Sequence, residues 1–216
     1  MEETSGLIDR LAANAIGAFE LSPDSSVDRI NVSENTTYRV DDPESDLRYA
    51  LRVHRLGYHS VEAIESELAW VLALLEAGVV ETARPLPARD GSRVVRVSVD
   101  GLPEPRNVVL FEWLDGAPPE AEDMESFRRL GAICARLHNH ARSWRRPAGF
   151  TRLAWDCDQL IGPHGRAGPW RDALGMGREE LALLTRLEET IRERLAAYGQ
   201  GSKRYGLTHA DLRIAN

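Results

Sequence analysis

The chain ends in a segment whose residue types and spacing suit phosphoryl transfer. Residues 209–216 read H-x-D-x-x-x-x-N, which places His209, Asp211 and Asn216 at the specified positions. Transfer to a hydroxyl needs a carboxylate that accepts the hydroxyl proton and an oxygen that holds the Mg²⁺ neutralising the phosphates. Asp211 fits the first role, Asn216 fits the second, and His209 can brace the loop backbone. An ordinary polar turn could carry the same residues, so the interpretation depends on the rest of the chain.

The overall composition is that of a globular protein. Of the 216 residues, 43% are hydrophobic and 28% are charged, enough for one large domain or two small lobes. The net charge of −7 argues against a nucleic-acid partner, whose binding surfaces are normally basic. No stretch approaches the ~18 apolar residues of a membrane span, and the N-terminus lacks the pattern of a signal peptide. Cys134 and Cys157 lack metal-ligand spacing, so we expect reduced thiols in a cytoplasmic protein without a membrane partner.

The first half of the chain is predicted to be rich in strands. Apolar residues at helical spacing indicate an N-terminal helix that begins at Thr4 or Ser5 and ends before Pro23. The period then shortens toward two, and a second helix, capped by Ser60 and ended by Gly78, interrupts the strands. The expected strands are three within residues 27–54 and further ones at 84–86, 93–99 and 107–113. We interpret this half as a five-stranded antiparallel sheet with one main helix.

The second half is predicted to be helical. The Gly116–Pro119 segment breaks the strand pattern and indicates a linker, after which residues 121–143 have the apolar stripe of a helix. Residues 145–177 are rich in Gly, Pro and Trp, which predicts a long loop with at most short helices. Residues 178–198 are helical again, and one apolar stripe is expected to face inward: Leu181, Leu184, Leu187, Ile191 and Leu195.

Six segments occur in the order in which one known family has them. They are Ser33–Val40, Tyr49–Arg55, Glu65–Trp70, Leu110–Gly116, Leu130–His138 and Leu207–Arg213. In this order, from about Val27 to Asn216, the chain resembles the aminoglycoside phosphotransferase and homoserine-kinase-like branch of the protein-kinase-like fold. The resemblance implies an α+β, two-lobe architecture. Residues 1–26 would be an N-terminal helical extension, 27–115 the nucleotide-binding lobe, and 116–216 a partial helical lobe ending in the catalytic loop.

The resemblance implies a pair of charged residues that positions the nucleotide. Arg52 lies in the third strand, where a kinase needs a cation for the α- and β-phosphates, and Glu67 lies on the next helix, where the partner of that cation would lie. The family often has lysine at the strand position, and arginine offers a two-pronged donor instead. Glu65 is the rival partner. Without the surrounding order of motifs, Arg52 could be a solvated strand residue and Glu67 an exposed helix carboxylate.

The remaining nucleotide contacts are implied by two further segments. A turn between the first two strands can present backbone N–H groups to phosphate oxygens, and by resemblance this is the segment Ser33, Asn35, Thr36 and Thr37. It contains no glycine, unlike the protein-kinase version, and most polar hairpin tips bind nothing. The adenine would contact the carbonyl of Glu112 and the amide of Leu114, with Phe111 behind it. Aromatic residues in strands usually pack in the core, which is the alternative for Phe111.

The function implied by the resemblance is ATP- and Mg²⁺-dependent transfer of the γ-phosphate to a hydroxyl of a small molecule. Arg213 could neutralise charge on the transferred group, or it could be a surface arginine. Aminoglycosides, homoserine, choline-like amino alcohols, sugars and a protein serine all remain open as acceptors. The family's second Mg²⁺-binding segment follows the catalytic loop and has no counterpart in this sequence. We therefore expect a fragment of a longer kinase with little activity alone, and a non-catalytic nucleotide-binding or interaction module stays open as the alternative.

Overall fold

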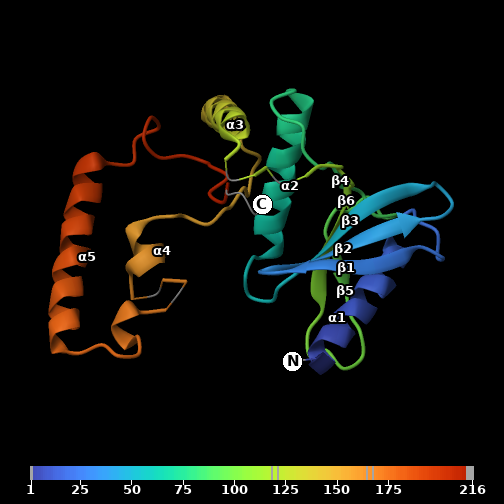
Figure 1. Cartoon of the computed structure of the whole chain (residues 1–216), viewed down its shortest axis with the longest axis horizontal. Coiled ribbons are helices and arrows are strands. Elements are labelled where there is room, and N and C mark those ends of the chain that lie inside the picture. The colour runs from blue at the N-terminus through green and yellow to red at the C-terminus, as the bar shows by residue number, and fades with distance from the viewer. Residues whose placement is uncertain (1, 118, 121, 164, 167, 213–216) are drawn as a thin grey trace.

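The protein is described by a computed structural model that covers residues 2–212 except 118, 121, 164 and 167. A strand-rich part comes first along the chain and a helical part follows, with the sheet at one end of the molecule and the last helix at the other (Figure 1). This is the two-part α+β arrangement that the sequence predicts. None of the described helices is both long enough and apolar enough to cross a membrane.

The sheet is antiparallel and has six strands. They are β1 (Ser26–Val32), β2 (Asn35–Asp42), β3 (Leu47–His54), β4 (Pro85–Leu86), β5 (Val95–Val97) and β6 (Arg106–Glu112). Their order is β1-β2-β3-β6-β4, and β5 pairs with β6 as well. The predicted total of five strands is wrong, although each of the six strands overlaps a segment that the sequence marked as a strand, because both short strands pair with β6 and belong to the same sheet. Leu86 lies opposite Leu110, while Val95 lies opposite Val108.

Alternate residues of β6 face two different layers, as expected for a strand buried on both sides. Val108 and Leu110 join the core beneath the N-terminal helix, whereas Val109 and Phe111 join the core beneath α2. Residues directly opposite each other in neighbouring strands lie on the same face of the sheet, so this alternation also shows which face each residue of β3 lies on. Arg52, which lies opposite Val109 in the neighbouring strand β3, is thereby on the face that α2 covers.

The N-terminal helix covers the other face of the sheet. Helix α1 (Glu2–Ala15) continues as a short 3-10 turn, η1 (Ile16–Ala18). It already includes Thr4 and Ser5, so the predicted helix start is wrong by a few residues. The buried core here comprises Leu11, Ala12, Ala15, Phe19, Tyr38, Val40 and Leu51. The hydroxyl of Tyr38 donates to Asp9 of α1 at 2.8 Å, and burial together with Asp9 raises the pKa of Tyr38, so this buried hydroxyl stays protonated.

Helix α2 (Val61–Glu76) has the predicted ends and connects the two parts of the molecule. The hydroxyl of Ser60 accepts a hydrogen bond from the Ala63 amide at 3.2 Å, which satisfies one of the free N–H groups of the first turn. Gly78 has a φ of +60°, the left-handed conformation that commonly ends a helix. One stretch of α2 packs on the sheet, and the next, with Trp70 and Leu74, packs on the helical part.

The helical part contains α3 (Met124–Ser143), α4 (Cys157–Ile161), a 3-10 turn η2 (Trp170–Asp172) and α5 (Arg178–Tyr198). The sheet ends at Glu112, and residues 113–117 have no regular structure; the linker between two lobes stays a prediction. Helix α3 begins later than predicted because the carboxylate of Asp123 accepts from the Ser126 amide at 3.0 Å and caps it there. The ends of α5 and the irregular 145–177 segment agree with the prediction.

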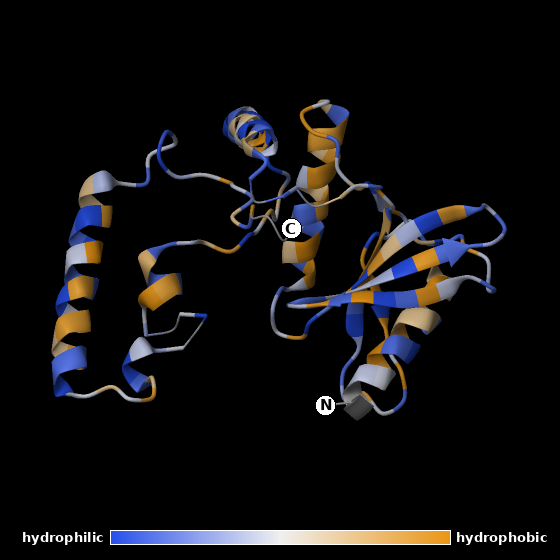
Figure 2. Cartoon of the chain, in the orientation of Figure 1, coloured by the Kyte–Doolittle hydropathy of each residue, from blue (hydrophilic) through white to orange (hydrophobic). Residues whose placement is uncertain are grey.

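The apolar stripe of α5 is only partly covered. Leu187 is 50% exposed and Leu195 is 48% exposed, so the expectation that this stripe faces inward is wrong for these residues. The helix lies at the end of the molecule away from the sheet, with orange apolar bands along it (Figures 1 and 2). Its buried residue is Glu188, whose carboxylate accepts from Trp170 Nε1 at 3.1 Å and Arg171 Nη1 at 2.9 Å. These polar contacts join α5 to the η2 segment.

Candidate active site

The predicted pair of charged residues is formed. Arg52 Nη1 donates to Glu67 Oε1 at 3.1 Å, which joins strand β3 to helix α2. The Arg52 guanidinium carbon also lies 5.0 Å from the centre of the Phe111 ring, within range of a cation–π contact. Glu65, the rival partner, is exposed on α2. The predicted contact is thus confirmed, whereas its role in nucleotide binding stays a prediction.

A second arginine, Arg152, contacts the same carboxylate, and the sequence did not indicate it. Its Nη2 lies 3.2 Å from Glu67 Oε2, and its Nη1 donates to the Ala63 carbonyl at 2.7 Å. It belongs to the irregular segment that follows α3. No periodicity marks an arginine in such a segment, so only the folded structure brings it to α2.

His54 lies next to this charged group, at the end of β3. It is 5% exposed, and within the described part of the chain neither ring nitrogen has a hydrogen-bond partner. Burial, followed by the positive charge of Arg52, lowers the pKa of His54 to about 4. The imidazole is therefore neutral at physiological pH and adds no charge to the site.

We predict that the buried His54 makes the protein less stable in acid. Its pKa falls from 6.5 in the unfolded chain to about 4 in the fold, so the unfolded state binds more protons between these values. The free energy of unfolding should therefore decrease as the pH falls through this range, by about 2–3 kcal/mol between pH 7.5 and 4.5 from this residue. Urea denaturation at a series of pH values measures this decrease in the free energy of unfolding.

The control for this prediction is His54→Leu, which fills a similar volume and does not titrate. The variant should lose less stability than the natural chain over the same pH range. His59, whose pKa burial also lowers, titrates in both proteins and cancels in the comparison. Parallel pH profiles for the two proteins would show that His54 does not cause the acid sensitivity.

The turn between β1 and β2 brings only part of the predicted phosphate-binding segment near Arg52. Thr37 lies opposite Arg52 in the neighbouring strand, and Thr36 lies opposite Val53. Ser33 is exposed at the turn, where its amide donates to the Asn35 carbonyl at 2.9 Å. The side-chain oxygen of Asn35 accepts from the Arg55 amide at 3.4 Å, so it ties the turn to the end of β3. Phosphate contacts by this turn remain a prediction.

The predicted adenine contacts lie where β6 leaves the sheet. Phe111 is 8% exposed and packs with Ile64 and Leu68 of α2, as a core residue does. The amide of Glu112 donates to the Arg84 carbonyl at 2.9 Å. Leu114 follows in the linker with its side chain 55% exposed. These residues thus lie at the junction of the two parts, and their contacts with adenine stay a prediction.

The start of the predicted catalytic loop is held against α2 and α3. Leu207 packs against the cluster that contains Trp70 and Leu137, and the Thr208 hydroxyl lies 3.2 Å from His138 Nε2. The Asp211 amide donates to His209 Nδ1 at 3.3 Å, so His209 contacts the loop backbone as predicted. The catalytic roles of both residues stay predictions.

Two predicted residues and the metal site cannot be placed. Arg213 and Asn216 lie outside the described residues. Within the described part, no group of three or more His, Cys, Asp or Glu side chains could hold a metal ion. The predicted Mg²⁺ ligand, Asn216, is not among the side chains surveyed, so its assignment stays a prediction.

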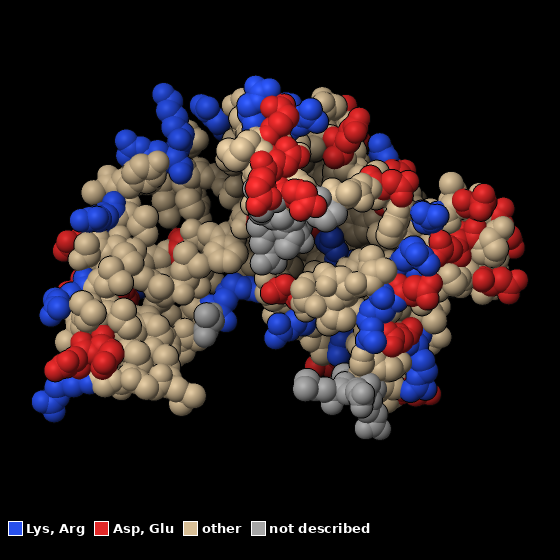
Figure 3. All heavy atoms as spheres, viewed as in Figure 1, with Lys and Arg blue, Asp and Glu red and all other residues tan. Residues whose placement is uncertain are grey.

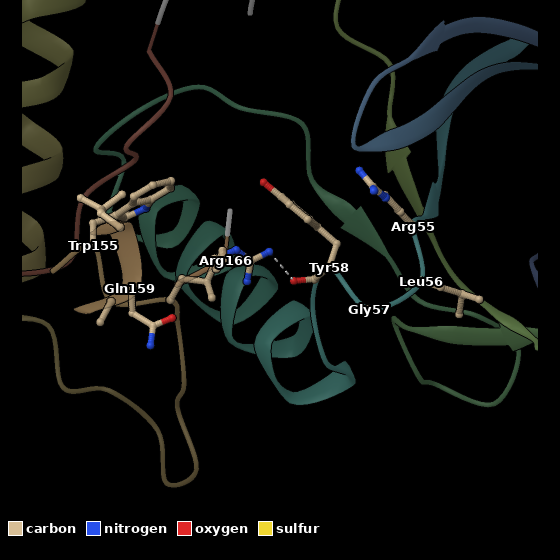
Figure 4. A pocket seen from close by; sticks show the side chains of 10 residues that line it. Arg55, Leu56, Gly57, Tyr58, Trp155, Gln159 and Arg166 are labelled. Atoms are coloured by element: carbon tan, nitrogen blue, oxygen red, sulfur yellow. Dashed lines mark hydrogen bonds between the residues drawn. The ribbon is translucent and has the colours of Figure 1, made fainter. Parts of the chain in front are cut away.

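A cleft of about 480 Å³ lies between the β3–α2 connection and the segment around α4. Its lining residues are Arg55, Leu56, Gly57, Tyr58, Leu153, Ala154, Trp155, Gln159, Leu160 and Arg166. Tyr58 and Arg166 approach each other from the two sides (Figure 4), and Arg166 Nη2 donates to the Tyr58 carbonyl at 2.9 Å. Its size is within the range of small-molecule sites. Nothing in the local sequence indicated this cleft.

The charges near the site differ from those at the far end of the sheet. Acidic side chains gather over the β2–β3 turn, at the right edge of Figure 3, where Glu44 and Asp46 are exposed. Around Glu67, by contrast, Arg52 and Arg152 give a local excess of positive charge. These three side chains alone carry a net charge of +1, in a protein whose net charge is −7.

A strand arginine paired with a helix glutamate, followed by a helical part with an H-x-D loop, is the arrangement of the protein-kinase-like phosphotransferases. Residues 28–216 match the model of the phosphotransferase enzyme family, known as APH. The chain belongs to this family, as the sequence resemblance indicated. A search of the curated proteins found no match.

Three solved structures show the same fold. The microcompartment-associated aminopropanol kinase is 45% identical, with a TM-score of 0.82, and the match covers 96% of this chain and 63% of that one. The amicoumacin kinase hAmiN, solved with AMP-PNP, Ca²⁺ and Ami, is 20% identical, with a TM-score of 0.76 and coverage of 100% and 62%. Spectinomycin phosphotransferase APH(9)-Ia, solved with ADP and spectinomycin, is 14% identical, with a TM-score of 0.58 and coverage of 96% and 63%. The chain thus spans less than two thirds of each of these proteins.

Proposed function

We propose that this chain carries the nucleotide-binding lobe and catalytic loop of an ATP-dependent phosphotransferase acting on a hydroxyl of a small amino alcohol. The observation that carries the proposal is the Arg52–Glu67 ion pair, because it joins a strand and a helix at the place where kinases position nucleotide phosphates. The name of the 45% identical relative, an aminopropanol kinase, supports the acceptor class. In this proposal residues 27–115 bind the nucleotide and residues 116–216 supply the catalytic loop.

Each proposed role follows from the chemistry of its residue. Arg52 binds the α- and β-phosphates of ATP, and Glu67 holds Arg52 in place. The Asp211 carboxylate orients the acceptor hydroxyl and accepts its proton as the oxygen attacks the γ-phosphorus atom. ADP leaves as the bond from the γ-phosphorus atom to the bridging oxygen breaks. Arg213 stabilises the negative charge on the transferred group.

The adenine and the metal complete the proposed complex. The base would bind at the junction of β6 and the linker, to the Glu112 carbonyl and the Leu114 amide. Mg²⁺ would neutralise phosphate charge, with the Asn216 amide oxygen as a ligand, since Mg²⁺ prefers oxygen donors.

The test is an assay of phosphate transfer by the full-length gene product with ATP and Mg²⁺. The acceptors are 1-amino-2-propanol, ethanolamine, choline, homoserine, a hexose and an aminoglycoside, with propanol as the control without an amine. We expect the highest kcat/KM for a small amino alcohol. Transfer to the hexose or the aminoglycoside instead would contradict the acceptor class. Nucleotide binding with no transfer to any of these acceptors would favour a non-catalytic module.

A further inference from the structure

Two arginines, Arg52 and Arg152, share the carboxylate of Glu67. Arg52 Nη1 donates to one oxygen of Glu67 at 3.1 Å, while Arg152 Nη2 lies 3.2 Å from the other oxygen. The side chains are partly exposed: Arg52 by 35%, Glu67 by 28% and Arg152 by 26%. They are therefore partly buried, and partly buried ion pairs are screened by salt less than fully exposed ones.

Arg152 also attaches to the backbone of α2. Its Nη1 donates to the Ala63 carbonyl at 2.7 Å, one helical turn before Glu67. The guanidinium thus spans one turn of the helix, with one nitrogen on the backbone and another on the carboxylate. Next to it, the Thr151 amide donates to the Ser66 hydroxyl at 2.9 Å. A segment of the helical part is in this way fixed to the helix that carries Glu67.

The charges of these residues leave a surplus of one positive charge. Two guanidinium groups and one carboxylate sum to +1, and an arginine fork facing an unshared carboxylate tends to bind it through two parallel hydrogen bonds. In the structure Arg152 contacts one carboxylate oxygen and Arg52 makes a single hydrogen bond to the other. The donors of Arg52 are then not all committed to Glu67, and an anion can bind to the rest.

We propose that Arg152 is a positioning residue that fixes the Glu67 carboxylate so that Arg52 keeps donors for the phosphates of a nucleotide. This inference rests on the proposed function, because it assigns the anion at Arg52 to a nucleotide. It adds a contribution of the helical part to a phosphate site otherwise built from β3 and α2. Arg152 acts through Glu67 and is not assigned a contact with the nucleotide.

The test is a double-mutant cycle read out as the Kd of AMP-PNP with Mg²⁺, measured by calorimetry on the full-length gene product. The proteins are the natural one, Arg152→Met, Glu67→Gln and the double variant. Methionine keeps the unbranched apolar stem of arginine and removes its charge. We expect Arg152→Met to weaken binding about tenfold, the size of one charge-assisted hydrogen bond. With Glu67→Gln in place, the same change should cost less than about twofold, because the carboxylate it holds is gone.

Two further variants separate positioning from a merely structural role. Arg145→Met removes an exposed arginine from the same irregular segment and should leave the Kd unchanged. Arg152→Lys retains a positive charge within reach of Glu67, so it should recover part of the lost affinity. If Arg152→Met does not fold, the cycle is run with Arg152→Gln, which keeps a donor.

The outcomes distinguish this inference from the proposed function. An equal loss of affinity with and without Glu67→Gln would overturn the inference, because Arg152 would then act through its attachment to α2 alone. Unchanged affinity in Arg152→Met would also overturn it while leaving the proposed function intact. Failure of the natural protein to bind AMP-PNP would overturn both.

Discussion

Asp211→Asn is expected to lower kcat for phosphate transfer by about 10²–10⁴-fold in the full-length gene product, the usual contribution of a general base. The amide is close in size to the carboxylate but does not accept the hydroxyl proton. The Kd of AMP-PNP should change much less, since the proposed role of Asp211 concerns the acceptor hydroxyl and not the nucleotide. A fall in kcat with little change in nucleotide affinity is the pattern of an interaction made in the transition state.

The matched control is Asp115→Asn, which removes the same charge from the linker. The Asp115 side chain is 89% exposed, and its contact from Trp113 Nε1 at 3.0 Å can be made equally well to an amide oxygen. This variant should retain the natural kcat. Equal turnover by the Asp211→Asn and natural proteins would remove Asp211 from the mechanism and leave the H-x-D segment as a polar loop.

Local patterns were sufficient to predict the elements around the site. The alternation in β3, the continuous apolar run in β6 and the period of 3.6 in α2 are dictated by which residues must be buried. Once β3 and α2 are in place, Arg52 has to lie on the face that α2 covers, because Leu51 and Val53 face the α1 side. The contact between Arg52 and Glu67 was predictable for this reason.

Contacts that depend on irregular backbone were not predictable. Arg152 reaches Glu67 from a segment without periodicity, and the cleft beside Tyr58 forms between that same segment and the β3–α2 connection. No spacing rule relates residues that are distant in sequence when one of them lies in a loop. Such contacts follow from the whole fold.

Two errors in the predicted elements have physical causes. The total of five strands was too low although the segments of β4 and β5 were expected to be strands, because the sequence does not show that both of these short strands pair with β6 in one sheet. The apolar stripe of α5 was assigned to a core on its period alone. The period identifies a face that tends to be buried, but it does not identify the layer that covers it, and here Leu187 and Leu195 are half exposed.

The second large effect is expected at Arg52. Arg52→Met should raise the Kd of AMP-PNP with Mg²⁺ by about 10–100-fold, because hydrogen bonds to charged groups contribute about 1.5–3 kcal/mol each. The substitution also leaves Glu67 paired with Arg152 alone, so the local charge falls from +1 to zero. Glu67 still has a cationic partner in this variant, so its carboxylate does not repel the phosphates as an unpaired one would. The loss of affinity therefore measures the loss of the Arg52 cation.

Two variants test whether the position of this charge matters. Arg48→Met removes an arginine that lies four residues away on the same face of β3, where it pairs with Asp41 at 3.4 Å. This variant should leave the Kd of AMP-PNP within about twofold, because charges separated by more than a Debye length are largely screened. Arg52→Lys keeps a cation at the site and should retain most of the affinity, although a lysine offers a point charge and not a fork. If Arg48→Met and Arg52→Met weakened binding equally, general attraction by the sheet would explain the affinity, and Arg52 would have no specific place in the phosphate site.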